Sequence, residues 1–285
     1  MAASVLFSTG GVAVKSIAFN GWQVAGLRSG IAAAALFMIV PSTRRRWDLK
    51  TILVSSAFAV TMILFILANK NTTAANAIFL QAAAPLYLLV LAPWLLKEPV
   101  RRADLIAMVA IAAGLVLVMS GHDAPTRIAP HPKIGNIMAV LSGVALAFTT
   151  IGLRWIGGME DGESRKDAVL VCGNFMSFLA CIPFALPFVG AQPIDWALIT
   201  YLGVIQIGLA YFLVMRGLRG VPAIEASLLM MIEPALNPLW VWLIHGEAPG
   251  PLALAGGALI LAASMGRAAA SRLDSHADVG YRRPS

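Results

Sequence analysis

Charged residues and cysteines are both scarce in this sequence. Only 12% of its 285 residues are Asp, Glu, Lys or Arg, while 59% are hydrophobic, so the chain is too apolar for a water-soluble domain. Its two cysteines, Cys172 and Cys181, are nine residues apart, which on one helix separates them by about 13 Å, beyond the reach of a disulfide. The composition therefore indicates that the chain is solvated by lipid and that both cysteines are reduced packing residues.

Apolar stretches occupy nearly the whole chain. A helix needs about 20 apolar residues to cross a bilayer, and these stretches lack the apolar/polar alternation of barrel strands, so we predict an all-α integral membrane protein with ten transmembrane helices. The predicted helices are residues 2–19, 22–40, 50–69, 74–95, 103–120, 136–157, 168–190, 196–218, 223–244 and 250–267. They leave no soluble domain for catalysis, nucleotide hydrolysis or DNA binding.

The basic residues are distributed unevenly between the two membrane sides. Of the 21 Lys and Arg residues, Arg28 lies within a helix, four lie on one side (Lys15, Lys70, Arg127 and Lys133), and the remaining sixteen lie on the other. Cytoplasmic loops carry the excess of Lys and Arg, which predicts a multi-pass protein of the inner (plasma) membrane with both termini in the cytoplasm. We interpret these charges as topology determinants and not as a nucleic-acid or lipid site.

The two halves of the chain repeat one pattern. Residues 74–119 and 223–267 each contain an apolar helix with a proline inside it, a glutamate thirteen residues later, and a second apolar helix. Pro85 and Glu98 thus correspond to Pro234 and Glu247, at an offset of 149 residues. Because five helices are an odd number, the second repeat must enter the membrane in the opposite orientation. We predict a first repeat at 1–120, a connecting loop at 121–135, a second, inverted repeat at 136–267, and a cytoplasmic tail at 268–285.

Small residues in the repeats predict a close helix contact. At the same offset, Ala107 and Gly114 align with Gly256 and Ala263. Small residues allow membrane helices to approach closely, so these stretches indicate a tight contact either between the two repeats or between protomers of a homodimer.

Prolines predict matching interruptions in the two repeats. Pro85 leaves the carbonyl of Gln81 without its helix partner, and Pro234 and Pro238 do the same in the ninth helix. Interrupted helices at corresponding places in two repeats are typical of a transport site at the middle of the membrane. The alternative is that these prolines merely bend their helices.

Glu233 is the clearest candidate for a transport residue. A charged side chain near the middle of the bilayer costs about 2.5–3.5 kcal/mol on insertion scales, so it should face the bundle interior or a wet cavity. There it could take up and release a proton as the cavity changes sides; the alternative is a protonated acid bonded to a backbone carbonyl freed by Pro234. Glu225, two turns earlier, is either a second acid on the pathway or a solvated residue at the start of its helix.

Six further residues are candidates for the substrate or proton pathway. Gln81 shares a face of the fourth helix with Pro85, four residues later. Lys15 and Arg28 either attract an anionic group, such as a carboxylate, or extend along the helix to the membrane interface. Asn237 either joins the pathway or hydrogen-bonds between helices. Tyr87 and Tyr211 lie deep enough in their helices to line an apolar substrate cavity.

These features together resemble a known family over nearly the whole chain. The motifs are Gly10 to Lys15 with Arg28 thirteen residues later, Ala74 to Gly114 with Pro85 and Lys97-Glu98, and a second copy from Ala223 to Ala263. They are similar to the drug/metabolite transporter superfamily, of the ten-helix EamA type. The resemblance implies a secondary active transporter, in particular a proton-coupled exporter of small metabolites, amino-acid-like compounds or amphipathic drugs that works by alternating access.

Three alternatives stay open beside this reading. One is an uncoupled permease or an uptake carrier, and another is a channel. The third, an integral-membrane enzyme, is disfavoured because the four histidines lie outside the helix interiors and away from carboxylates at ligand spacing, and because the chain has no glycine-rich phosphate loop. We therefore expect no metal, no cofactor and no nucleic-acid partner, with protons, a small-molecule substrate and the bilayer as the partners.

Overall fold

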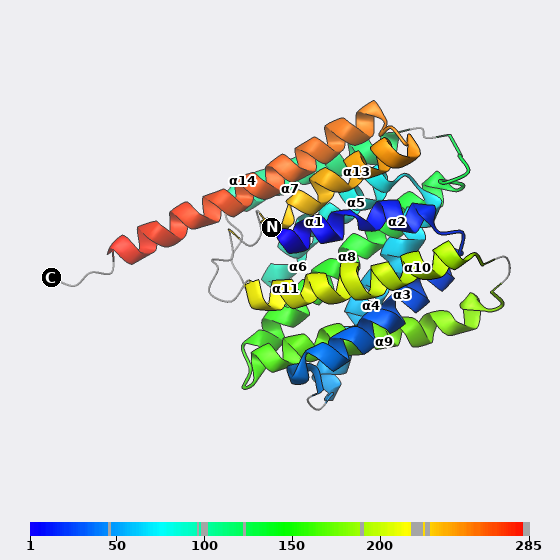
Figure 1. Ribbon diagram of the computed structural model, residues 1–285. Coiled ribbons are helices and arrows are strands. Elements are labelled where there is room, and N and C mark those ends of the chain that lie inside the picture. Colours follow the sequence, from blue (N-terminus) through cyan, green and yellow to red (C-terminus); the bar gives the residue numbers. More distant parts are fainter. Residues whose placement is uncertain are drawn as a thin grey trace.

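The computed structural model is built from helices throughout its described part (Figure 1). It describes residues 1–44, 47–95, 97, 102–121, 124–188, 191–217, 225 and 229–281, with side chains up to residue 270. The helices are α1 (Ala2–Ser8), α2 (Gly10–Ser16), α3 (Gly21–Ile39), the 3-10 helix η1 (Pro41–Arg44), α4 (Leu49–Asn71), α5 (Ala74–Ala82), α6 (Ala84–Leu95), α7 (Arg102–Ser120), α8 (Pro132–Gly157), α9 (Gly162–Ala185), α10 (Pro193–Tyr201), the π-helix η2 (Leu202–Leu209), α11 (Ala210–Gly217), α13 (Ile232–His245) and α14 (Pro251–Tyr281).

Eight helical segments in this part of the chain are long and apolar enough to span a membrane. They correspond to eight of the ten predicted spans, which confirms the all-α membrane class. Of the other two, residues 2–19 form the short helices α1 and α2, and the stretch 223–244 is described only at Glu225 and from residue 229 onward.

Several boundaries differ from those expected from hydropathy. Helix α8 begins at Pro132, inside the expected loop 121–135, because proline is favoured in the first turn of a helix. Helix α9 covers 162–185 in place of 168–190. Helix α14 continues to Tyr281, so the expected tail at 268–285 is helical over most of its length. Hydropathy detects only the lipid-embedded part of a helix, whereas the backbone hydrogen bonds continue into water.

The starts of the long helices follow from their capping residues. The Asn20 side chain accepts a hydrogen bond from the Gln23 backbone, and the Gln23 side chain accepts one in return, which forms a capping box at α3. Asp48 accepts from the backbone of Thr51 at α4. These side chains satisfy backbone donors that no helical carbonyl can reach.

Among the described residues, three membrane segments are interrupted within their apolar stretches. The first is broken at Thr9, between α1 and α2, and the fourth at Ala83, between α5 and α6. Helix α13 begins at Ile232, immediately after a turn at Met231. The breaks at Ala83 and Met231 lie two and three residues before Pro85 and Pro234, where a proline removes a helical backbone donor.

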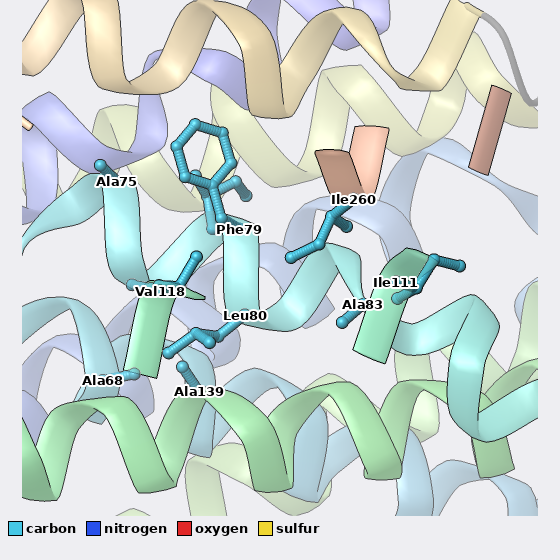
Figure 2. Close-up of a cluster of buried hydrophobic side chains, with 11 residues drawn as sticks. Ala68, Ala75, Phe79, Leu80, Ala83, Ile111, Val118, Ala139 and Ile260 are labelled. Carbon is cyan, nitrogen blue, oxygen red and sulfur yellow. The ribbon is translucent and has the colours of Figure 1, made fainter. Parts of the chain in front are cut away.

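The largest buried apolar cluster surrounds the interrupted fourth segment (Figure 2). Phe79, Leu80 and Ala83 from this segment pack with Ile111 of α7 and Ile260 of α14. The fourth segment of the first repeat is therefore held against the last helix of each repeat.

Helices α7 and α14 lie side by side and run antiparallel. Gly256 packs against Leu117 and Val118, whereas Arg267, at the other end, pairs with Asp104. These are the fifth and tenth predicted segments, which are equivalent in the repeat. Opposite directions for equivalent helices are what an inverted repeat requires.

Candidate functional site

A cavity of about 440 Å³ lies between the interruptions of the fourth and ninth segments. Gln81 and Pro85 line it from the first interruption, and Met230 and Met231 line it from the second. Arg154, which is exposed, and Arg267 lie at its edge, on α8 and α14. The two interruptions thus face one cavity, which extends toward the end of the bundle that carries these arginines; we call this the arginine end.

Hydrogen bonds fix the first-repeat wall of this cavity. Gln81 donates from Nε2 to Ser142 Oγ at 2.7 Å, and the Ser142 hydroxyl donates to the carbonyl of Thr61 at 3.1 Å. The chain of bonds joins α5, α8 and α4. Gln81 is therefore positioned by two other helices, and Ser142 is a site residue that the sequence did not single out.

Tyr87 lies beside this wall on α6. A Cβ built on Gly143 of α8 would lie 3.2 Å from the Tyr87 ring, so the glycine permits the close approach of the two helices. The Tyr87 hydroxyl is buried and has no hydrogen-bond partner among the described residues. A buried hydroxyl without a partner is costly, so this group is available to a bound molecule or a water.

Arg28, Tyr211 and Glu233 form an electrostatic cluster in the interior of the bundle. They come from α3, α11 and α13, and Arg28 interacts electrostatically with both of the others. Phe7 and Phe58 pack on the Tyr211 ring in edge-to-face geometry, with centroids 5.1 and 6.0 Å away. The cluster therefore combines a cation and an acid within apolar surroundings.

Arg28 does not extend to the membrane interface. Its residue exposure is only 2%, and its Nη2 contacts the Met62 sulfur at 3.5 Å. Its Nε has no hydrogen-bond partner in the described part of the chain. The alternative of an interfacial Arg28 is therefore wrong, because packing turns its face of α3 toward the bundle interior.

Glu233 lies in the first turn of α13 and is partly accessible. Its carboxyl makes no hydrogen bond or ion pair within the described residues, although it lies within electrostatic range of Arg28 and Tyr211. A helix amino terminus favours a negative charge, so both α13 and Arg28 can support the ionised form. Glu233 thus lies within electrostatic range of the Arg28 cation without forming a hydrogen bond or an ion pair with it.

Lys15 is committed to partners at the other end of the bundle. Its ammonium group donates to the carbonyls of Thr72, at 2.6 Å, and Ile128, and it pairs with Glu247 at 3.3 Å. Neither free attraction of an anion nor extension to the interface describes this geometry. Glu247 also accepts a hydrogen bond from the backbone of Ala74 at 2.5 Å, which makes it an anchor for the start of α5.

Asn237 and Gln206 lie at the interruption of the first segment. A Cβ on Gly10 would lie 2.8 Å from Gln206 Nε2, and one on Gly11 would collide with the Asn237 amide. Gln206 donates to the carbonyl of Phe7 at 3.2 Å from within the π-helix η2. Neither amide atom of Asn237 has a hydrogen-bond partner among the described residues. The Thr9 interruption and the π-helix carry no proline, so the sequence did not indicate them.

The remaining candidates differ in their surroundings. Glu225 is exposed, which fits the solvated alternative at the start of its helix. Pro238 is buried inside α13, which continues through it. Glu98, the repeat partner of Glu247, lies outside the described residues. A larger groove, of about 520 Å³, lies between α3 and α9, but its lining, which includes Leu27, Phe175 and Phe178, is apolar and contains none of these polar groups.

The sequence profile of the EamA-like transporter family matches residues 1–120 and 133–266, which is most of both halves. The uncharacterized transporter YetK of Bacillus subtilis (strain 168) is 24% identical over 227 residues, which cover 73% of this chain and 66% of YetK, just under two thirds of its length. An uncharacterized transporter of Archaeoglobus fulgidus is 26% identical over 261 residues, or 91% of each chain. These matches indicate a transporter and not an enzyme.

The fold also matches a solved structure. A crystal structure described only as that of a protein superimposes with a TM-score of 0.63 over 95% of both chains, at 19% sequence identity. At this identity the likeness concerns the fold alone.

Proposed function

The chain belongs to the EamA-like transporter family, and we propose that it is a proton-coupled secondary active transporter that works by alternating access. The observation that carries this proposal is the arrangement of Glu233, a carboxyl within a membrane segment that lies within electrostatic range of Arg28 and Tyr211 and has no hydrogen-bonded partner in the described part of the chain. Such a carboxyl is free to exchange a proton. Intramembrane acids in these surroundings are typical of proton relays.

The shape of the molecule supports alternating access. The cavity between the two interruptions extends to the arginine end, while the Lys15 end is closed by buried polar contacts. With the arginine end in the cytoplasm, as the distribution of basic residues predicts, this conformation is inward-facing. Inverted repeats that exchange their conformations would convert it into an outward-facing one.

The family resemblance implies export. It also implies a substrate among small metabolites, amino-acid-like compounds or amphipathic drugs. The cavity is compatible with a small amphipathic molecule because methionine, leucine and proline side chains line it together with Gln81 and Thr150. An uncoupled permease or an uptake carrier is the alternative. The homodimer stays a prediction; Gly114 and Gly256, two of the small residues on which it rested, pack against each other within one chain.

The test is transport by purified protein in proteoliposomes with an imposed pH gradient. Ethidium and a set of tritiated amino acids serve as probes, and counterflow without a gradient is measured in parallel. We expect the gradient to drive uphill flux of at least one probe. Counterflow without any gradient-driven flux would establish the uncoupled permease.

Glu233→Gln tests the residue assignment. We expect it to abolish gradient-driven flux while counterflow persists, because glutamine keeps the size of the side chain but cannot carry a proton. Glu225→Gln is the matched control, since Glu225 is an exposed acid on the same predicted helix. Gradient-driven flux that survives in Glu233→Gln would show that another group carries the proton.

A further inference from the structure

We infer that Lys15 and Glu247 form the gate that closes the transport pathway at the end of the bundle opposite the arginine end. Lys15 lies in the last turn of α2, and Glu247 lies in the connection between α13 and α14. Their side chains are only 1% and 9% exposed, and Nζ lies 3.3 Å from Oε2. This inference rests on the proposed alternating access and assigns a role within it to two residues that are remote from Glu233.

The pair connects several of the segments that meet at this end. Lys15 bonds to the carbonyl of Thr72, in the α4–α5 connection, and to that of Ile128, in the connection between the repeats. Glu247 accepts from the backbone of Ala74 at the start of α5. Two of the three ammonium donors thus bond to backbone carbonyls, while the contact with Glu247 is an ion pair in which Oε2 has no hydrogen-bond partner among the described residues. A single buried contact thus joins the first repeat, the linking segment and the second repeat.

The interface between α2 and α13 below this pair contains a buried amide without hydrogen-bond partners among the described residues. Helix α2 contacts α13 where Gly11 faces Asn237, and the Asn237 amide is 1% exposed with neither polar atom paired within the described residues. A buried amide in that state gains hydrogen bonds when water reaches it. Opening the interface between α2 and α13 therefore relieves the desolvation penalty of the Asn237 amide. We assign the opposing, closing interaction to the contacts of Lys15 and Glu247.

The chemistry of the pair suits a reversible contact. Desolvation of two charges offsets much of their attraction, so a buried ion pair is a weak source of stability but a specific connection between segments. Ser16 and His245, which hydrogen-bond at 3.1 Å, extend the same contact between α2 and α13 toward solvent. Both helices adjoin interruptions, at Thr9 and Met231, which allow their outer parts to move separately from the rest of their segments.

The experiment measures opening directly, without substrate or a pH gradient. In a cysteine-free background (Cys172→Ala, Cys181→Ala), spin labels are placed at Ala18→Cys and Ala248→Cys, two exposed positions on either side of the pair. Electron paramagnetic resonance distances are compared between the wild-type pair and Lys15→Met/Glu247→Gln. We expect the neutral pair to raise the share of the longer distance several-fold. An unchanged distance distribution would overturn the inference.

The matched control is Asp48→Asn/Arg165→Gln. It removes an ion pair that also joins the two repeats, between the start of α4 and α9. We expect it to leave the label distances unchanged; an equal lengthening in the control would mean that any lost ion pair loosens the bundle, and would also overturn the inference.

A single variant tests the gate in case the double variant does not fold. Glu247→Gln alone keeps an acceptor for the Ala74 backbone and leaves both carbonyl bonds of Lys15 in place, and we expect a smaller shift in the same direction. Labelling of Asn237→Cys by a membrane-impermeant maleimide should accelerate in parallel, and unchanged labelling would contradict the gate. Since neither readout involves proton coupling, the gate and the proposed function can fail separately.

Discussion

Gly114 of α7 packs directly on the backbone of Gly256 in α14. A Cβ on Gly114 would lie 2.7 Å from the Gly256 carbonyl oxygen and 2.8 Å from the Ile260 side chain. In the repeat, Gly114 is equivalent to Ala263 and Gly256 to Ala107. The closest contact between the last helices of the two repeats is therefore made by small residues that the sequence pattern already related to each other.

Gly114→Ala should destabilise the protein because the added methyl group must displace a backbone carbonyl. Overpacking of this kind costs about 1–3 kcal/mol. Gly266→Ala is the control on α14, because a Cβ at Gly266 meets nothing within 4 Å and alanine is the better helix former. Thermal unfolding in detergent should show a lower Tm for Gly114→Ala and an unchanged or higher Tm for Gly266→Ala. Equal Tm values would contradict the close contact.

Arg28 and Glu233 should act as a coupled pair in transport. We expect Arg28→Met to reduce gradient-driven flux by about tenfold or more, because Glu233 loses its neighbouring cation. A tenfold loss corresponds to an interaction free energy of about 1.4 kcal/mol. Because Glu233→Gln is expected to keep counterflow, the double-mutant cycle is measured by counterflow: Arg28→Met/Glu233→Gln should show no less counterflow than Glu233→Gln alone, because the two residues interact. Independent, multiplicative losses would show that Arg28 acts separately, for example in folding. Arg165→Gln serves as the control for loss of an arginine at a partly exposed position.

Asp48 should make stability depend on acid pH. The Arg165 guanidinium, together with the Thr51 backbone, holds the pKa of this carboxyl well below its usual range. A lowered pKa in the folded state contributes stability above the unfolded value of about 3.9, and that contribution declines as the pH falls below it. Asp48→Asn keeps the cap on α4 but removes the charge.

The Tm of Asp48→Asn should therefore lie below that of the wild type at pH 7, and the difference should shrink toward pH 3.5. The two side chains are 38% and 30% exposed, which keeps the effect below about 1 kcal/mol. Glu163→Gln, in the exposed pair with Lys166, should show no comparable pH dependence. A Tm difference for Asp48→Asn that stays constant with pH would exclude the charge as its cause.

The sequence pattern predicted the two helix interruptions that lie next to a proline. Pro85 and Pro234 remove backbone donors wherever they occur in a helix, so the sequence alone placed weak points close to Ala83 and Met231. The interruption at Thr9 and the π-helix around Gln206 have no such signature. They arise where Gly10 and Gly11 allow two amide side chains to approach the backbone, which depends on neighbouring helices.

By itself the sequence determined the membrane environment, the all-α class and most of the spans, because these depend on hydrophobicity along one chain. Only the tertiary structure decided which way each polar side chain faces. Arg28 and Lys15 were equivalent in the sequence, as basic residues in the outer halves of helices. Packing rotates α3 so that Arg28 lies near Glu233, while Lys15 bonds to Glu247, since the rotation of a helix about its axis is set by its neighbours.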